Sequence, residues 1–343
     1  MSHVPGTLPH VEPQRRPGVY DAYWRFAAER HSIFLRRLDG ASSPWTDDPI
    51  LREFKFCNVY RASDRVSQFL IRNVAYGEFA SQLSADDVFL RIVLFRLFSK
   101  ESTWDLLETA TGGIQRSTFD VDRLGELLEQ AKRRGPIYTS AFILAPDPRG
   151  RSKHRSHLAI VDSMFRDGTL PAALARANSL GEVYEALLAW PMIGPFLAYQ
   201  IAIDLNYSEH LNFNEDEFTV PGPGALRGLR KVFSDFGGRT PAQLVHLMVE
   251  NQESEFERLG LMFDGLFGRR LHAIDCQGLF CEVDKYSRAA FPELKSERVR
   301  IKHRFGPSPL PLPLFYPPKW GINSKVPRQK FAPTRQPTLA FGV

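Results

Sequence analysis

Apolar positions recur every three or four residues along most of the chain, and residues that can cap a helix precede several of these stretches. One such start is Ser179-Leu-Gly-Glu182, which has the spacing of a capping box. The pattern predicts a mainly helical protein. The expected helices are Asp21–Leu38, Ser84–Phe98, a helix capped by Ser102 and Asp105, Asp120–Gly135, Leu158–Phe165, Leu180–Ala189, Phe196–Leu205, Thr240–Val249 and Leu271–Ala290, while Tyr138–Leu144 fits either a short strand or a buried helix.

A short turn joins two of these expected helices, Leu180–Ala189 and Phe196–Leu205. Pro191 ends the first helix, Gly194 is expected to adopt a positive φ, and Pro195 is preset for the first turn of the second helix. The amide groups that open such a helix point outward and suit a phosphate oxygen. The turn therefore predicts either a helix-hairpin-helix that holds one DNA strand or an ordinary helical hairpin.

Composition places the chain among globular proteins. Its 343 residues, 43% of them apolar, suffice for one large domain or two small ones. No apolar run approaches the roughly eighteen residues of a membrane span, and no signal-peptide block is present, so we expect a soluble, cytoplasmic protein with no membrane partner. We expect no cofactor and no metal, since a zinc site at Cys276, Cys281 and His272 would match no standard ligand spacing.

The net positive charge is modest, at +5, but it is clustered. Lys132–Arg134 precedes Gly135 and complements the end of the helix predicted there. A second basic cluster lies between residues 149 and 155, and a third between residues 298 and 304. Each cluster alone is typical of a solvated surface, whereas several of them beside a DNA-type turn favour a phosphate backbone as partner.

Proline-rich stretches near both ends suggest the domain organisation. Residues 1–17 predict a flexible leader, and residues 306–343 predict a proline-rich arm that either wraps the protein or stays loose. The intervening residues 18–305 are expected to form one helical domain, with the hairpin at residues 180–205.

An acidic run follows the hairpin. Glu215, Asp216 and Glu217 come one helix and one loop after Gly194 and lead into Phe-Thr-Val-Pro-Gly-Pro-Gly. This order resembles the helix-hairpin-helix DNA glycosylase superfamily, in which a similar hairpin is followed by a catalytic carboxylate. The resemblance implies a mainly α, two-lobed glycosylase-like fold and a catalytic role for Glu217 and Asp216. Glu217 ranks first because it adjoins the glycine-rich motif, and a solvated acidic turn is the alternative.

Four further motifs occur in order along the chain. They are Phe56-Cys-Asn-Val-Tyr-Arg-Ala-Ser-Asp-Arg-Val66, Ile92-Val-Leu-Phe-Arg-Leu-Phe98, Gly222-Pro-Gly-Ala-Leu-Arg-Gly228 and Phe280-Cys-Glu-Val-Asp-Lys-Tyr-Ser-Arg288. Together they resemble the base-hypermodification proteins of phages and bacteria, the α-glutamyl/putrescinyl thymine pyrophosphorylase-like or "5-hmdU DNA kinase, helical domain" family, which is placed on the glycosylase fold. Ser99 departs from the pattern, which has Asn at that place.

These motifs and the hairpin supply the candidate site residues. On a helix, Arg61, Asp64 and Arg65 would share a face, which permits a clamped carboxylate or merely a weak surface ion pair. The residues expected to line or brace a base pocket are Asn58, Arg61, Asp64, Arg65, Asp284 and Lys285. Those expected to contact DNA are Met192, Ile193, Gly194, Phe196, Gly222, Gly224, Arg227, Lys153 and Arg155, although a plain helix start explains the glycine-rich motif equally well.

The leading hypothesis is a DNA glycosylase that removes a bulky modified pyrimidine, such as glucosylated hydroxymethylcytosine, from double-stranded phage DNA and leaves abasic sites, in antiviral defence. Phe196 stands where bifunctional glycosylases carry a Schiff-base lysine, which implies a monofunctional enzyme. The alternatives are an amino-acid or polyamine transferase acting on 5-phosphomethyl-dU in DNA and a non-catalytic DNA-binding protein. No Gly-x-x-x-x-Gly-Lys-Ser/Thr motif occurs, which disfavours a P-loop kinase, and no obligate protein partner is expected.

Overall fold

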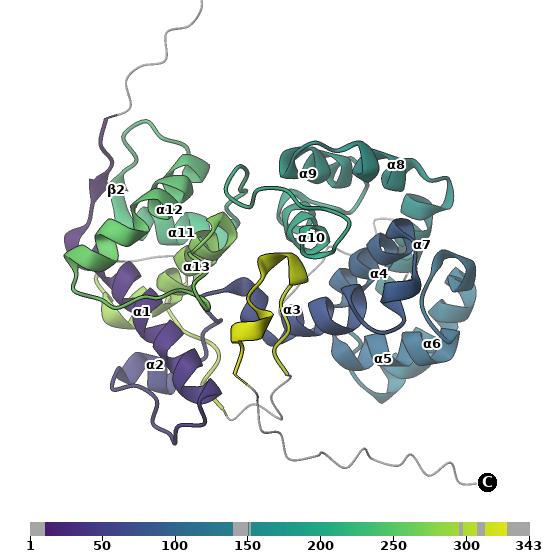
Figure 1. The fold of residues 1–343 in the computed structure, drawn as a ribbon, viewed down its shortest axis with the longest axis horizontal. Helices are drawn as coiled ribbons and strands as arrows, with labels where there is room; N and C mark the ends of the chain where they lie inside the picture. The colour runs from purple at the N-terminus through teal and green to yellow at the C-terminus, as the bar shows by residue number, and fades with distance from the viewer. Residues whose placement is uncertain (1–10, 140–149, 151, 295–297, 307–312, 328–343) are drawn as a thin grey trace, which may run out of the picture.

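The computed structural model describes residues 11–139, 150, 152–294, 298–306 and 313–327. These residues form a mainly helical fold, as predicted, with a small antiparallel pair of strands (Figure 1). The strands are β1 (Gln14–Arg15) and β2 (Phe233–Asp235), and the helices are α1 (Pro17–Leu38), α2 (Pro49–Glu53), α3 (Arg65–Phe69), α4 (Ala85–Phe98), α5 (Glu101–Thr111), α6 (Val121–Arg134), α7 (Lys153–Arg166), α8 (Thr169–Arg176), α9 (Leu180–Leu188), α10 (Pro195–Tyr207), α11 (Pro223–Val232), α12 (Pro241–Arg258) and α13 (Ala273–Ala290).

The helices form two groups that lie side by side in Figure 1. In one group α13 packs against α1, α11 and α12, and in the other α4 packs against α7 and α10. The helix α3 and the segment 313–327 lie between the groups. Buried apolar side chains from both groups belong to one continuous core. Residues near α3 and in the segment 313–327 can therefore contact both groups.

The helices α11 and α13 approach closely because α11 carries glycine on the facing side. A Cβ on Gly224 would lie 2.3 Å from Cys281 Sγ, and a Cβ on Gly228 would lie 1.9 Å from the Phe280 carbonyl oxygen. Both distances are far below van der Waals contact, so the packing requires glycine at both positions. The structure thus gives Gly224 a role in helix packing, and its expected contact with DNA stays a prediction.

The helical hairpin predicted around residue 194 is confirmed as α9, a short turn and α10, but the conformation of the turn differs from the prediction. Met192 has a positive φ of 66°, whereas Gly194 has a φ of −80° and is the N-cap of α10. The Ile193 amide donates to the Trp190 carbonyl at 3.2 Å, and Pro191 occupies the position that a type II turn favours. The expected positive φ at Gly194 is therefore wrong, because the turn already closes at Met192.

Several predicted helix starts are confirmed by their caps. At the start of α12, Thr240 Oγ1 accepts from the Gln243 amide at 3.2 Å, and Gln243 Oε1 accepts from the Thr240 amide at 2.8 Å. Ser179 Oγ accepts from the Glu182 amide at 3.2 Å at the start of α9, whereas the Glu182 carboxylate accepts from the Asn178 amide at 2.8 Å, so this cap is not reciprocal. The helix α12 extends beyond Val249 to Arg258, so its predicted end is too early.

The predicted cap at Ser102 is wrong. The helix α5 begins at Glu101 with Lys100 as its N-cap, so Ser102 lies inside the helix. Ser99 ends α4 in the left-handed conformation, with a φ of 49°, and the chain enters the next helix almost at once. Too few residues remain between the two helices for a cap at Ser102.

Segments near both ends of the chain make defined contacts. Arg16 donates its amide to the Val232 carbonyl at 2.9 Å, next to the β1–β2 pair. Tyr316, in the proline-rich part of the chain, is fully buried. The segment Tyr138–Leu144 lies mostly outside the described residues. Within the described residues, no helix is both long enough and apolar enough to cross a lipid bilayer.

Candidate functional site

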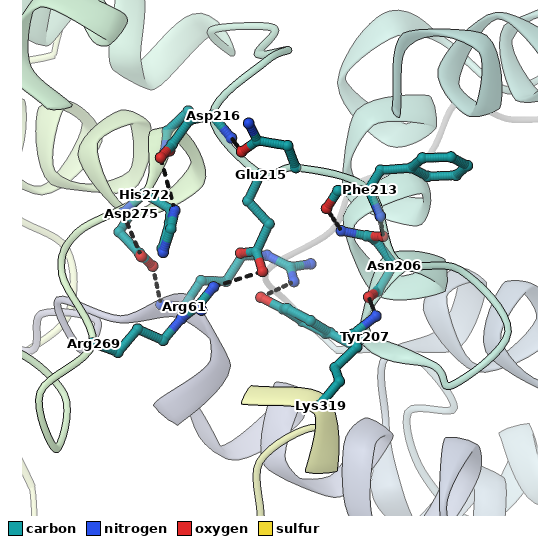
Figure 2. A network of polar contacts seen from close by, with 12 residues as sticks. Arg61, Asn206, Tyr207, Phe213, Glu215, Asp216, Arg269, His272, Asp275 and Lys319 are labelled. Carbon is teal, nitrogen blue, oxygen red and sulfur yellow. Dashed lines mark hydrogen bonds and ion pairs between the residues drawn. The ribbon is translucent and has the colours of Figure 1, made fainter. Parts of the chain in front are cut away.

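A network of polar side chains gathers where the two helix groups meet (Figure 2). It contains the start of α13, the loop between α10 and α11, the C-terminal half of α10, the turn that precedes α3, and the segment 313–327. We call this network the interhelical centre. Its residues come from parts of the sequence that are far apart, so only folding brings them together.

Arg61 connects three parts of the interhelical centre. Its amide donates to Asp275 Oδ1 at 3.0 Å, and its guanidinium donates to Gln200 Oε1 at 3.0 Å and to Asp204 Oδ1 at 2.8 Å. Asp204 is fully buried on α10 and also pairs with Arg96 of α4. The buried Nη2 of Arg61 has no hydrogen-bond partner within the described residues. Arg61 therefore joins the two helix groups and keeps one donor unused.

The three acids of the predicted catalytic run lie in different surroundings. Glu215 is buried and accepts from Arg269 Nη2 at 2.6 Å. Asp216 Oδ2 lies 3.0 Å from His272 Nδ1, and its other oxygen accepts from the Ala273 amide at 3.0 Å. Glu217 is exposed. The interhelical centre thus contains Asp216 but not Glu217, which the sequence analysis ranked first.

The pKa values of two carboxyl groups in the interhelical centre are shifted in opposite directions. Burial, aided by the nearby charge of Glu215, raises the pKa of Asp275 to about 6. Burial would also raise the pKa of Asp216, but the hydrogen bond and charge of His272 lower it below its ordinary value. Asp216 is therefore a stable carboxylate at neutral pH and can orient the ring of His272.

The segment 313–327 supplies two residues that the sequence analysis missed. Lys319 Nζ donates to the carbonyl oxygens of Asn206 and Ser208 at the end of α10, at 3.0 Å for Ser208, and to that of Leu211 in the following loop. Burial lowers the pKa of Lys319 to about 8. The Arg269 guanidinium lies 3.8 Å from the centroid of the Trp320 ring. A Lys-Trp pair in a proline-rich stretch belongs to no periodic pattern of apolar residues. Only the folded structure therefore shows that this pair belongs to the interhelical centre.

The residues predicted for a base pocket do not gather in one place. Asp64 accepts from the Asn58 amide at 2.8 Å, and Asn58 Oδ1 accepts from Arg30 at 2.7 Å. Arg65 pairs with Glu101 at 2.7 Å on the surface. The helix begins only at Arg65, so Arg61, Asp64 and Arg65 do not share a helix face and bind different partners. Of these four candidates, Arg61 belongs to the interhelical centre, whereas the other three bind partners outside it.

Asp284 and Lys285 lie further along α13. Asp284 is fully buried and pairs with Arg227, Lys231 and Arg288, while Lys285 pairs with Glu282 at 2.7 Å. Nine residues of helix, about 13 Å, separate Asp284 from Asp275. The structure therefore places both residues away from the interhelical centre.

The residues predicted to contact DNA divide into two sets. Gly194 and Phe196 are exposed at the start of α10, beside the half-buried Met192 and the buried Ile193. The Phe196 ring covers Gly222, where a Cβ would lie 2.7 Å from it. The second set already has partners within the protein: Arg227 bonds Asp284, Lys153 lies over the Tyr138 ring, and Arg155 lies 3.6 Å from Asp122.

A surface pocket of about 500 Å³ lies away from the interhelical centre, between α4, α7 and the turn at residues 116–118. Its charged residues pair among themselves. Asp87 accepts from the Arg116 amide at 2.7 Å, and Asp162 pairs with Arg166. The volume of this pocket does not by itself indicate a reaction. The unusual charges lie in the interhelical centre instead.

Comparison with known proteins shows which family this arrangement represents. The family model described as "5-hmdU DNA kinase, helical domain" matches residues 17–296. The chain belongs to this family. A protein of Bacillus phage SP10 named 5-hmdU DNA kinase is 30% identical over 295 residues, which cover 80% of this chain and 46% of that protein. The chain thus spans less than half the length of this relative.

This finding corrects the leading hypothesis. The expected DNA glycosylase, a hydrolase, is wrong, because the relative is named as a kinase, which transfers a phosphoryl group. The expected link to modified DNA and to phages holds at the level of the family. No solved structure matches the chain, so the likeness to the glycosylase superfamily stays a prediction.

Proposed function

We propose that this chain binds double-stranded DNA carrying 5-hydroxymethyl-deoxyuridine and holds that base for phosphorylation of its hydroxymethyl group. The name of the phage relative supports the substrate and the type of reaction. The observation that carries the proposal for this chain is the Asp216–His272 pair beside two arginines, Arg61 and Arg269. A hydroxyl group that accepts a phosphoryl group needs a base for its proton and cations for the phosphate oxygens.

Each residue of the interhelical centre has a role in this proposal. Asp216 holds Nδ1 of His272, which leaves Nε2 of His272 to take the proton of the hydroxymethyl group. The oxygen of that group then forms a bond to the γ-phosphorus of a nucleoside triphosphate, the bond from that phosphorus to the bridging oxygen breaks, and the nucleoside diphosphate leaves. The unused Nη2 of Arg61 offers a donor to a phosphate oxygen or to the base.

The hairpin is the proposed grip on the DNA backbone. Its exposed Gly194 begins α10, and the space beside it is open, because an added Cβ would meet no atom within 4 Å. The start of α10 would bind a phosphate through backbone amide groups and the positive end of the helix dipole. This proposal keeps the two-lobed, helix-hairpin-helix arrangement of the glycosylases as the means of holding DNA, with a different reaction at the base.

The test is binding to two duplexes that differ at one base, 5-hydroxymethyl-deoxyuridine or thymidine. A site that hydrogen-bonds the hydroxyl group should prefer the modified duplex by about tenfold or more. His272→Gln should reduce this preference, and Glu217→Gln serves as the control at the exposed acid. Equal affinity of the unaltered chain for both duplexes would overturn the proposal.

A second candidate is transfer of an amino acid or polyamine to 5-phosphomethyl-dU in DNA. The absence of a P-loop motif from the sequence favours it over direct use of a nucleoside triphosphate by this chain. Arg61 and Arg269 would then stabilise the departing phosphate. Nucleoside mass spectrometry separates the two, because phosphorylation adds one phosphoryl group whereas the transfer adds an amine-bearing group.

A further inference from the structure

Three cations surround one carboxylate on the far half of α13. Arg288 Nη2 lies 2.6 Å, Lys231 Nζ 3.1 Å and Arg227 Nε 3.2 Å from the carboxylate oxygens of Asp284. The side chains of the three cations are only 8%, 6% and 16% exposed. Three positive charges against one negative charge leave a net charge of +2 in a largely buried place.

Among the described residues, no other anion balances this excess. Burial raises the pKa of the neighbouring Cys281 thiol to about 11, so it stays neutral, and Glu282 pairs instead with Lys285. Nε of Arg288 is buried without a hydrogen-bond partner among the described residues, and Arg227 bonds Asp284 through Nε. One carboxylate shared by three cations leaves an excess of positive charge in a largely buried place, which is costly, so this cluster favours a bound anion.

A basic segment extends the cluster at the surface. Residues 298–304 run past the end of α13, where Arg288 donates to the Arg300 carbonyl at 3.1 Å. The segment is held against residues 53–55, since the Lys55 amide donates to the His303 carbonyl at 2.9 Å. The side chains of Arg300, Lys302 and Arg304 are exposed, and the 3.4 Å pair of Arg304 with Glu53 is largely solvated.

We propose that the Asp284 cluster and the segment 298–304 together form a second DNA-binding surface, which contacts the phosphate backbone of the duplex whose modified base enters the interhelical centre. The proposal rests on the function proposed above. The segment lies outside the residues that the family model matches, so this surface adds to what the family assignment provides.

The geometry fits one duplex at both places. About 13 Å of α13 separates Asp275 from Asp284, and one strand of B-DNA rises about 3.4 Å per phosphate. The cluster should therefore meet the backbone roughly four nucleotides from the modified base. A long duplex whose modified base lies two pairs from the end that faces the cluster should lack these contacts, and one with long flanks on both sides should make them.

The experiment compares two triple variants of the whole chain. Arg300→Ala, Lys302→Ala and Arg304→Ala together remove three exposed charges from the proposed surface. Lys132→Ala, Arg133→Ala and Arg134→Ala remove three exposed charges at the end of α6 and form the matched control. Fluorescence anisotropy gives Kd for a long duplex over a range of salt concentrations, and thermal unfolding verifies that each variant folds.

We expect the first variant to bind the long duplex roughly ten- to a hundredfold more weakly at low salt. The slope of log K against log salt should fall by roughly 0.9 for each phosphate that the variant no longer neutralises, and the control should keep the slope of the unaltered chain. A first variant that keeps the slope of the control would overturn the proposal. If the first variant loses affinity equally for modified and thymidine duplexes, the surface is confirmed even where the unaltered chain shows no base preference and the proposed function fails.

Discussion

The two ends of α13 place the same kind of residue in opposite electrostatic surroundings. At the start of the helix, Asp275 accepts backbone hydrogen bonds from Arg61 and His272, and its pKa is raised to about 6, chiefly by burial. In the second half, burial would likewise raise the pKa of Asp284, but Arg288 and Lys231 lower it. Both acids are buried, so the number of charged partners decides whether the pKa of an acid on this helix is raised or lowered.

The comparison also separates two kinds of binding. The start of α13 combines acids, a histidine and paired arginines, which suits proton transfer at a base. The second half holds an excess of positive charge, which suits a phosphate backbone. The two proposals thus assign chemistry to the start of α13 and affinity to its second half, and substitutions in each half should alter the two separately.

The largest effect is expected from Asp284→Asn, which leaves three cations without their carboxylate. Breaking a buried ion cluster from one side costs about 3–5 kcal/mol of unfolding free energy. Urea unfolding at neutral pH measures this loss of unfolding free energy. Glu101→Gln, in the exposed pair with Arg65, is the control and should cost less than about 1 kcal/mol. An equally small loss for both variants would show that the Asp284 cluster is solvated.

Asp275→Asn should change the pH dependence of stability. A carboxyl with a higher pKa in the folded than in the unfolded chain stabilises the fold while protonated, so the unfolding free energy falls as pH rises from about 4 to about 6. The shift from 3.8 to about 6 corresponds to about 3 kcal/mol. Urea unfolding at several pH values should show a flatter dependence in Asp275→Asn. An unchanged dependence would contradict the raised pKa.

Gly228→Ala should destabilise the protein by about 1–3 kcal/mol or more, because the new methyl group would collide with the backbone of α13. Gly194→Ala meets open space and should leave the unfolding free energy nearly unchanged. Thermal unfolding of both variants measures this difference. An unchanged melting temperature in Gly228→Ala would mean that α11 and α13 can separate at no cost. The two ends of α13 would then not be held by the same packing.

Trp320→Leu should have the smallest effect, confined to the start of α13. Losing the aromatic face releases the Arg269 guanidinium, and a cation–π contact of this kind is worth about 1 kcal/mol. We expect the preference for the modified duplex to fall by about fivefold to tenfold, while the salt dependence of binding stays the same. Trp320→Phe should retain most of the preference. If Trp320→Leu lowers the melting temperature but leaves the preference for the modified duplex unchanged, Trp320 contributes to stability alone.

Local signals in the sequence predicted much of the fold. Thr240 and Gln243 formed a recognisable capping box, and Ser179 with Pro191 marked the beginning and end of α9. These signals act within a few residues, so one short stretch of sequence contains all the interacting groups. The prediction of a cap at Ser102 was wrong because Ser99 adopts a left-handed conformation, which no pattern in the sequence indicated.

The candidate site was predictable only in part. Arg61 and Asp216 both lie in the interhelical centre, and their roles there stay predictions. The expected hydrolysis is contradicted, because the phage relative is named as a kinase. Asp284 was expected at the same pocket and lies elsewhere. Sequence proximity to a motif does not show which side of a helix faces a cavity, and Asp284 shares its motif with residues on several faces.

The sequence by itself determined most of the long helices, the caps of α9 and α12, the presence of the hairpin and the family, because each depends on neighbouring residues or on motifs in order. Only the tertiary structure decided that Glu217 is exposed while Asp216 meets His272, and that Trp320 of the proline-rich segment covers Arg269. The physical reason is that charge pairing and burial depend on distance in space, and the groups concerned come from distant parts of the chain.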